Sequence, residues 1–193
     1  MSETVQSKRK KKKEEKPKKP LWWEIGSWIL TLGSAVVIAL LIRTYLFFPV
    51  RVDGHSMENT LLDREIVVAT IPEYLRGDYN RRDIVICHYP NRGSTLFVKR
   101  LVALPGDTLE IRDGVLYVNG EMVDESDVDM STESHTTLGP ITLGEDQFFV
   151  MGDNRGNSND SRAPGVGPLT RDQIVAHARR VVWPLSKFWD KVQ

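Results

Sequence analysis

Cysteine is almost missing from this sequence, and neither sign of charge is in excess. The 193 residues include one cysteine, Cys87, which excludes an intrachain disulfide framework and a cysteine-rich zinc site. Basic and acidic residues number 26 each, which argues against a dedicated nucleic-acid binder. Long apolar runs are absent apart from one near the N-terminus, and no internal repeat is visible. The composition therefore excludes a polytopic membrane protein but allows a single span.

The one apolar run covers 18 uncharged residues, Ile25 to Ile42. As a helix rising about 1.5 Å per residue it is roughly 27 Å long, close to the ~30 Å hydrocarbon core of a bilayer. Aromatic residues flank it as at membrane interfaces: Trp22, Trp23, Trp28, Tyr45, Phe47 and Phe48. A membrane anchor over residues 21–48 is therefore predicted. A buried core helix and a cleaved signal peptide are the alternatives, although the bulky residues after Ile42 do not resemble a cleavage site.

The basic charge is concentrated in residues 1–20, which hold nine basic and three acidic side chains, so the rest of the chain carries a net charge of −6. Positive charge beside a span stays cytoplasmic. The tail is therefore expected in the cytoplasm, next to anionic lipid, with everything after residue 48 outside. A nucleic-acid patch or a solvated tail is the alternative.

Residues 49–193 show short apolar runs separated by turn residues. Enrichment in β-branched and aromatic residues predicts strands. The predicted strands cover residues 65–69, 83–87, 96–102, 108–111, 115–118 and 147–151. Residues 121–145 are polar and turn-rich, which predicts a surface excursion. A short C-terminal helix is expected from Thr170 to Arg180, with Thr170 and Gln173 as its capping box. The fold class is therefore mainly β.

Ser56 lies only eight residues after Phe48. Eight extended residues span at most about 28 Å, so Ser56 lies close to the bilayer surface. Its surroundings, Gly54 to Glu58, lack the second glycine of the hydrolase nucleophile elbow. Alone, the serine is indistinguishable from polar surface.

Lys99 lies on a predicted strand between Phe97 and Leu101, which share its face. A lysine among apolar neighbours loses hydration, and its pKa falls from about 10.4 towards neutrality. A neutral amine within hydrogen-bond reach of a serine hydroxyl can take its proton. The alternative is an edge-strand lysine whose ammonium reaches water. The neighbouring Arg100 is expected on the opposite face, in water.

Residues 151–162 combine small, acidic and amide side chains with two arginines. Asp153 with Arg155, and Asp160 with Arg162, are placed to form paired or crossed bidentate salt bridges. A metal loop is the alternative, but Arg155 stands where an EF-hand needs a ligand. No metal and no cofactor are expected.

Together these segments resemble the type I signal peptidases, membrane-anchored serine proteases that remove signal peptides. The matching stretches are residues 54–61, 82–85, 98–107 and 151–162. The resemblance implies that Ser56 is the nucleophile and Lys99 the general base. Ser158 would orient Lys99, the Ser56 N–H would donate to the oxyanion, and Met57 would line pockets for small −1 and −3 residues. Salt-bridged side chains would support the site: Asp153, Arg155, Asp160 and Arg162.

Three positions depart from the family's pattern. Gly54 stands where some members have a serine, which leaves a second oxyanion donor unassigned. Asn59 replaces the usual proline and Arg82 the usual glycine, and both put loop geometry in doubt rather than the proton transfer.

The resemblance implies a single-pass protein of the cell membrane that cuts signal-peptide-bearing preproteins outside the cytoplasm, as a monomer and without nucleic acid. The alternatives are a Ser-His-Asp triad using His88 or His135, a self-cleaving Ser-Lys protease of the repressor type, and a non-enzymatic β module with a decayed site. The aromatic segment 183–189 is expected to cover the core, with lipid contact as the alternative.

Overall fold

The computed structural model describes residues 20–45, 47–71, 77, 79–126, 128 and 136–192. The predicted basic tail, residues 1–20, lies outside this range apart from Pro20, and so does His135. The chain divides into two compact units, Met1–Leu40 and Leu41–Gln193.

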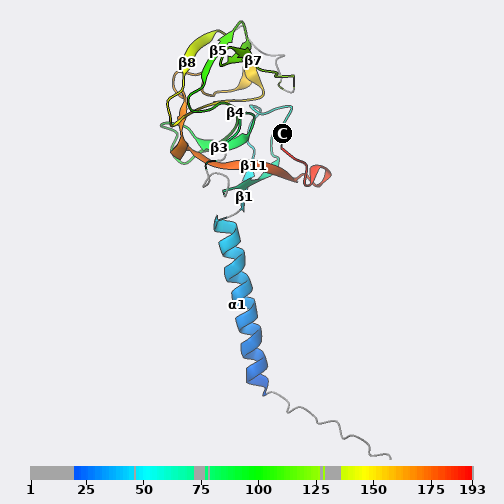
Figure 1. Cartoon of the computed structure of the whole chain (residues 1–193). Coiled ribbons are helices and arrows are strands. Elements are labelled where there is room, and N and C mark those ends of the chain that lie inside the picture. The colour runs from blue at the N-terminus through cyan, green and yellow to red at the C-terminus, as the bar shows by residue number, and fades with distance from the viewer. Residues whose placement is uncertain are drawn as a thin grey trace, which may run out of the picture. The chain divides into compact units, whose positions relative to one another are not determined.

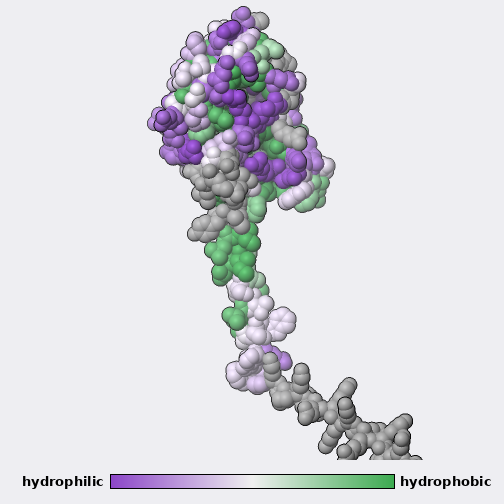
Figure 2. Space-filling model, viewed as in Figure 1, coloured by the Kyte–Doolittle hydropathy of each residue, from purple (hydrophilic) through white to green (hydrophobic). Residues whose placement is uncertain are grey.

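The first element is helix α1 (Leu21–Tyr45) (Figure 1). Its segment Leu21–Ile42 has a mean hydropathy of 2.3 and none of it is buried, which does not fit a core helix. Figure 2 shows apolar side chains on the visible face of this helix. The hydroxyls of Ser27, Thr31 and Ser34 donate to main-chain carbonyls three or four residues earlier, so these polar groups need no water. Length, composition and internal hydrogen bonding all suit a bilayer-spanning helix.

Seven antiparallel strands form the larger sheet, in the order β1-β2-β11-β3-β4-β9-β10. They are β1 (Phe47–Arg51), β2 (Ile66–Thr70), β3 (Ile84–His88), β4 (Leu96–Ala103), β9 (Gln147–Met151), β10 (Leu169–Thr170) and β11 (Ile174–Trp183). Successive residues of β3 enter different apolar clusters, Ile86 with Val67 and Val85 with Leu101. The sheet therefore buries apolar side chains on both faces.

A smaller antiparallel sheet has the order β7-β6-β5-β8. Its strands are β5 (Thr108–Arg112), β6 (Val115–Val118), β7 (Glu121–Met122) and β8 (Leu138–Thr142). A third apolar cluster joins this sheet to β4 and β9 through Val102 and Phe149. β7 and β8 fall within residues 121–145, so the described part of the expected excursion contributes to this sheet.

Each of the six predicted strands is present, with ends within one residue of the prediction. Two hairpin turns are made by residues with positive φ, Asp113 (50°) with Gly114 (84°) and Asn119 (55°) with Gly120 (82°). Asn-Gly and Asp-Gly pairs adopt this conformation readily, which is why the turns are visible in the sequence.

The helix predicted from Thr170 to Arg180 is wrong, because this segment enters the central strand β11. The capping box between Thr170 and Gln173 is present, but it closes a single 3₁₀ turn, η2 (Arg171–Gln173). From Ile174 the chain is extended and pairs with β2 on one side and β3 on the other. Two flanking strands outweigh a local helix signal.

The aromatic C-terminal segment does not cover the core, contrary to the expectation. After β11 the chain turns through η3 (Leu185–Lys187) and folds back, so that the Trp189 N–H donates to the Val181 carbonyl at 2.7 Å. Four large side chains of this turn are exposed: Trp183 (51%), Leu185 (70%), Phe188 (56%) and Trp189 (56%). Lipid contact remains as the alternative for this segment.

Candidate active site

Ser56 and Lys99, 43 residues apart in sequence, meet beside β4. Lys99 Nζ lies 2.5 Å from Ser56 Oγ and also donates to its own strand, at 2.9 Å from the Val98 carbonyl oxygen. The structure therefore brings together the serine and the lysine singled out in the sequence.

The position of Lys99 on β4 removes its amine from water. Lys99 pairs in register with Val85 of β3, and Leu101 on the same face is fully buried. Lys99 itself is 3% exposed. Burial lowers its pKa below the ordinary lysine value, outweighing opposite contributions from Cys87, Asp160 and Asp153. An edge-strand lysine with its ammonium in water does not fit this geometry.

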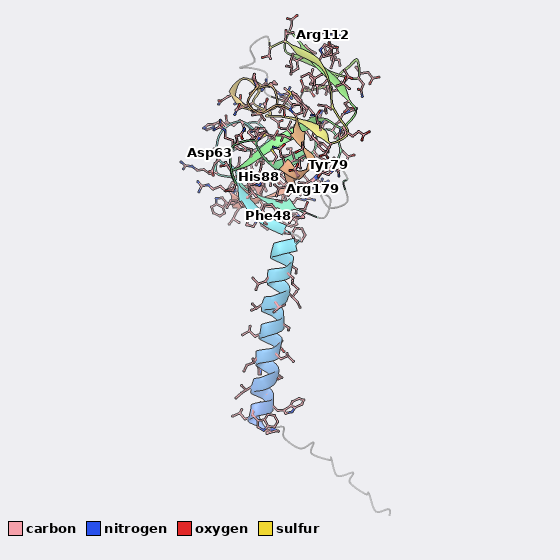
Figure 3. All side chains as sticks on the ribbon, turned by 90° about the vertical axis from the view of Figure 1, so that its left-hand side faces the viewer. Phe48, Asp63, Tyr79, His88, Arg112 and Arg179 are labelled. Atoms are coloured by element: carbon pink, nitrogen blue, oxygen red, sulfur yellow. The ribbon has the colours of Figure 1, made fainter. Side chains whose placement is uncertain are left out.

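Ser56 lies at the start of a tight turn that begins and ends on the larger sheet. The N–H of Val52 donates to the Glu65 carbonyl at 2.8 Å, which closes the base of the loop. Asp63, labelled in Figure 3, accepts the Gly54 N–H at 2.9 Å. Met57 turns inward and is 1% exposed, so it anchors the loop in the apolar core.

A cavity of about 180 Å³ opens beside the pair. Its lining comes from the end of β1, the serine loop and the first half of β4: Arg51, Val52, Asp53, Ser56, Met57, Thr95, Leu96, Phe97, Val98 and Lys99. β9 pairs with β4 only from Arg100 onward, so within the described strands the same edge of β4 has no partner over residues 96–99. An extended peptide therefore has both an open strand edge and a cavity available next to Ser56.

Gly152 lets residues 151–162, the acidic-arginine segment, pack directly on residues 52–65, the loop that carries Ser56. A Cβ at this position would lie 2.3 Å from Ser158 Oγ and 2.4 Å from the Ser56 carbonyl oxygen. That carbonyl accepts the Asn154 N–H at 3.1 Å. Only glycine permits this close approach, because any larger residue would push Ser56 or Ser158 aside.

Asp160 and Arg162 form the bidentate pair expected from the sequence, with both N···O distances at 2.9 Å. Burial disfavours the charged Asp160, but the bonds and charge of Arg162 and the Gly152 N–H hold its pKa below the ordinary value. Ser158 Oγ is buried and also helps to lower the pKa of Asp160, although among the described residues it makes no hydrogen bond of ordinary geometry. The expected bond from Ser158 to Lys99 is therefore not formed in this structure.

Asp153 pairs with Arg100, not with Arg155. Both Arg100–Asp153 contacts are 2.7 Å, the pair is buried, and Thr60 Oγ1 donates to the same carboxylate at 2.5 Å. The expectation that Arg100 lies in water is wrong, because the other face of β4 is also covered. Arg155 instead contacts Glu125 at 2.5 Å and donates to the Gly152 carbonyl at 3.0 Å. A metal loop would need these same carboxylates, and no group of three metal-binding side chains occurs in the described part of the chain.

The described histidines make other contacts. His55 lies 2.5 Å from Glu58 and is exposed. His88 Nδ1 lies 3.1 Å from the Thr95 carbonyl oxygen, at the end of β3 (Figure 3). His177 is buried and faces Asp83 at 3.5 Å. Within the residues that the structure describes, none of these three rings contacts the Ser56 hydroxyl as a base would.

All three departures from the family pattern have positive φ, with Gly54 at 103°. Asn59 has φ 74°, a conformation that asparagine tolerates and proline does not reach. Arg82 has φ 77°, where glycine is free of strain, and its carbonyl accepts a bond from Arg100 at 3.0 Å. The backbone therefore reaches the site geometry despite both substitutions.

The profile of one protein family, described as "Signal peptidase, peptidase S26", matches residues 25–183. Signal peptidase I S of Bacillus subtilis (strain 168) is 39% identical over 169 residues, which cover 83% of this chain and 90% of that protein. Probable signal peptidase I-2 of Synechocystis is 33% identical over 176 residues, which cover 89% of this chain and 78% of that protein. A solved signal peptidase I from Enterococcus faecalis V583 is 30% identical, with a TM-score of 0.43, and covers 52% of this chain and 96% of that one.

The close packing at Gly152 predicts a site-specific intolerance of a methyl group. We expect Gly152→Ala to lower the free energy of unfolding by about 1–3 kcal/mol, because overpacking displaces neighbouring groups. Gly165→Ala is the matched control, since a Cβ there meets nothing within 4 Å. Urea denaturation of the full chain in detergent measures both, and equal stability of the two variants would contradict the packing described.

Proposed function

The chain belongs to the signal peptidase family, peptidase S26, and is a serine endopeptidase that removes signal peptides; from that membership we propose that Ser56 is its nucleophile and Lys99 its general base. The observation that carries the proposal is the 2.5 Å contact between Lys99 Nζ and Ser56 Oγ. The same lysine is 3% exposed, so its amine is held away from water.

A lysine acts as a base only when it is uncharged. At an ordinary pKa of about 10.4, roughly one lysine in 250 is neutral at pH 8. Burial lowers the pKa of Lys99 and so raises this fraction. In the proposed reaction the neutral amine takes the Ser56 proton while Oγ attacks the scissile carbonyl. The ammonium then protonates the leaving amine, and the lysine next activates the water that releases the acyl group.

The oxyanion of the proposed reaction is bound by the main-chain N–H of Ser56. Gly54 has no side chain to add a second donor, and its N–H already donates to Asp63. We therefore assign one donor, and the transition state depends more heavily on the dyad.

The substrate is proposed to bind as an added strand along the open edge of β4. Alternate side chains of an extended peptide point the same way, so positions −1 and −3 face the cavity together. A volume of about 180 Å³, lined in part by Met57 and Val98, suits small side chains. We propose that this volume sets a preference for small residues at both positions.

The acidic-arginine segment is proposed to support the dyad. Asp160 with Arg162 fixes the loop carrying Ser158, which would orient the Lys99 amine once substrate is bound. Arg155 ties the same loop to Glu125. Asp153 supports it from the other side, through Arg100 on β4.

The bilayer is the proposed partner of α1. We place residues 1–20 in the cytoplasm, the anchor over residues 21–48 and the catalytic domain, residues 49–193, outside, because the basic charge precedes the span. The exposed aromatic segment 183–189 is proposed to add lipid contact. A monomer is sufficient, since Ser56, Lys99 and the cavity all come from one chain.

Two other functions account less well for these observations. A self-cleaving protease of the repressor type has a DNA-binding segment where this chain has α1. A non-enzymatic β module has no need of an amine buried against a serine, and burying an unpaired charge would only destabilise it.

The proposed dyad predicts the effect of two substitutions on the cleavage of a preprotein with small residues at −1 and −3. Ser56→Ala and Lys99→Ala should each lower the rate at least about a hundredfold with the fold intact. The exposed Ser186→Ala and Lys191→Ala are matched controls and should cleave at the wild-type rate. Full activity of Lys99→Ala would rule out the proposed base.

The lowered pKa of Lys99 predicts the direction of the pH dependence. The neutral amine is the active form, so the rate should rise with pH and level off below the ordinary lysine value of about 10.4. Steady-state cleavage from pH 5 to 10 measures this. A flat profile across that range is incompatible with a lysine base.

A further inference from the structure

Tyr89 is a buried aromatic residue just after β3 that none of the roles above uses. It is 3% exposed. Its ring stacks on Phe97 with a centroid distance of 4.1 Å and an interplanar angle of 7°. Phe97 lies on β4 two residues before Lys99, so Tyr89 packs directly against the strand that carries the amine.

The phenol of Tyr89 reaches the acidic-arginine segment at Asn159. Its hydroxyl donates to the main-chain carbonyl oxygen of Asn159 at 2.9 Å. Asn159 stands between Ser158 and Asp160. Among the described residues, this is the one hydrogen bond to the main chain of Ser158 or Asn159.

Other contacts hold the flanks of this segment but not its centre. Asp160 is fixed by Arg162 and by the Gly152 N–H. Upstream, the Asn157 N–H donates to the Asn154 carbonyl at 3.1 Å. Downstream, Ser161 exchanges two hydrogen bonds with Val150 of β9, each at 3.1 Å. Between these anchors, Tyr89 supplies the attachment to the sheet at Asn159.

Burial, together with nearby Cys87 and Asp160, raises the pKa of Tyr89 far above its ordinary value. The hydroxyl thus stays protonated and able to donate over the whole range in which Lys99 titrates. The charged and titratable groups acting on Lys99 are Cys87 from β3 and Asp153, Asp160 and Arg162 from the loop.

We propose that Tyr89 is a positioning residue, which holds residues 158–160 over Lys99 and keeps water from the amine. The inference rests on the proposed function, because it concerns the environment of the general base. Removing the hydroxyl breaks this part-buried bond to the Asn159 carbonyl and frees the segment to move outward. Water then reaches Lys99, its ammonium is better solvated, and its pKa returns towards the ordinary value.

The test compares Tyr89→Phe with wild type in the full chain, because phenylalanine keeps the ring stacked on Phe97. We expect kcat to fall about tenfold at pH 8 with KM changed less than twofold, and the midpoint of the kcat profile to move to higher pH. Tyr117→Phe, which removes a phenol hydroxyl on the smaller sheet, is the matched control and should match wild type.

An activity-independent readout separates this proposal from the proposed function. The pH dependence of Lys99 acylation by a small amine-reactive reagent, read by mass spectrometry, reports the pKa in both proteins. A higher midpoint in Tyr89→Phe supports the positioning role whether or not the substrate is cut. An unchanged midpoint overturns it, even if stability falls and wild type cleaves normally.

Discussion

Withdrawal of one lysine amine from water is the constraint on which the rest of the structure depends. A buried ammonium is costly, so the protein favours the neutral form of Lys99 and gives it a hydroxyl at 2.5 Å. Strand β4 achieves this because it lies inside the larger sheet, where both faces are covered. The turn that carries Ser56 is held beside this strand by two features. Met57 is buried in the apolar core, and the Val52 N–H donates to the Glu65 carbonyl where the loop closes.

Paired ions surround the Lys99 amine. Arg162 holds Asp160 and Arg100 holds Asp153, and although both carboxylates raise the pKa of Lys99, burial outweighs them. Buried pairs of this kind contribute little net stability, since desolvation offsets their attraction. Their effect is geometric: each fixes a loop whose main chain contacts the serine or covers the amine. Gly152 makes that contact possible, because a Cβ would occupy the space between the two loops.

Strands, hairpin turns and the apolar span are predictable from the sequence because local composition determines them. The burial of Lys99 is one of two outcomes that Phe97 and Leu101 on its face allow, because an edge-strand lysine can also reach water, and the structure decides between them. The burial of Arg100 is not, since it depends on a sheet covered on both sides and on a carboxylate 53 residues away. The helix prediction for residues 170–180 fails for the same reason. The capping box of Thr170 and Gln173 is present, but pairing of β11 with two strands decides the conformation of the residues that follow. The contact between Tyr89 and Asn159 spans 70 residues and has no sequence signal.

The most direct measurement is the titration of Lys99 itself. Its Cε resonance can be followed by carbon NMR in the full chain in micelles and assigned by its loss in Lys99→Arg. Burial predicts a midpoint below that of the exposed lysines and below the ordinary value of about 10.4. A midpoint in the range of exposed lysines would contradict a neutral amine as the base beside Ser56.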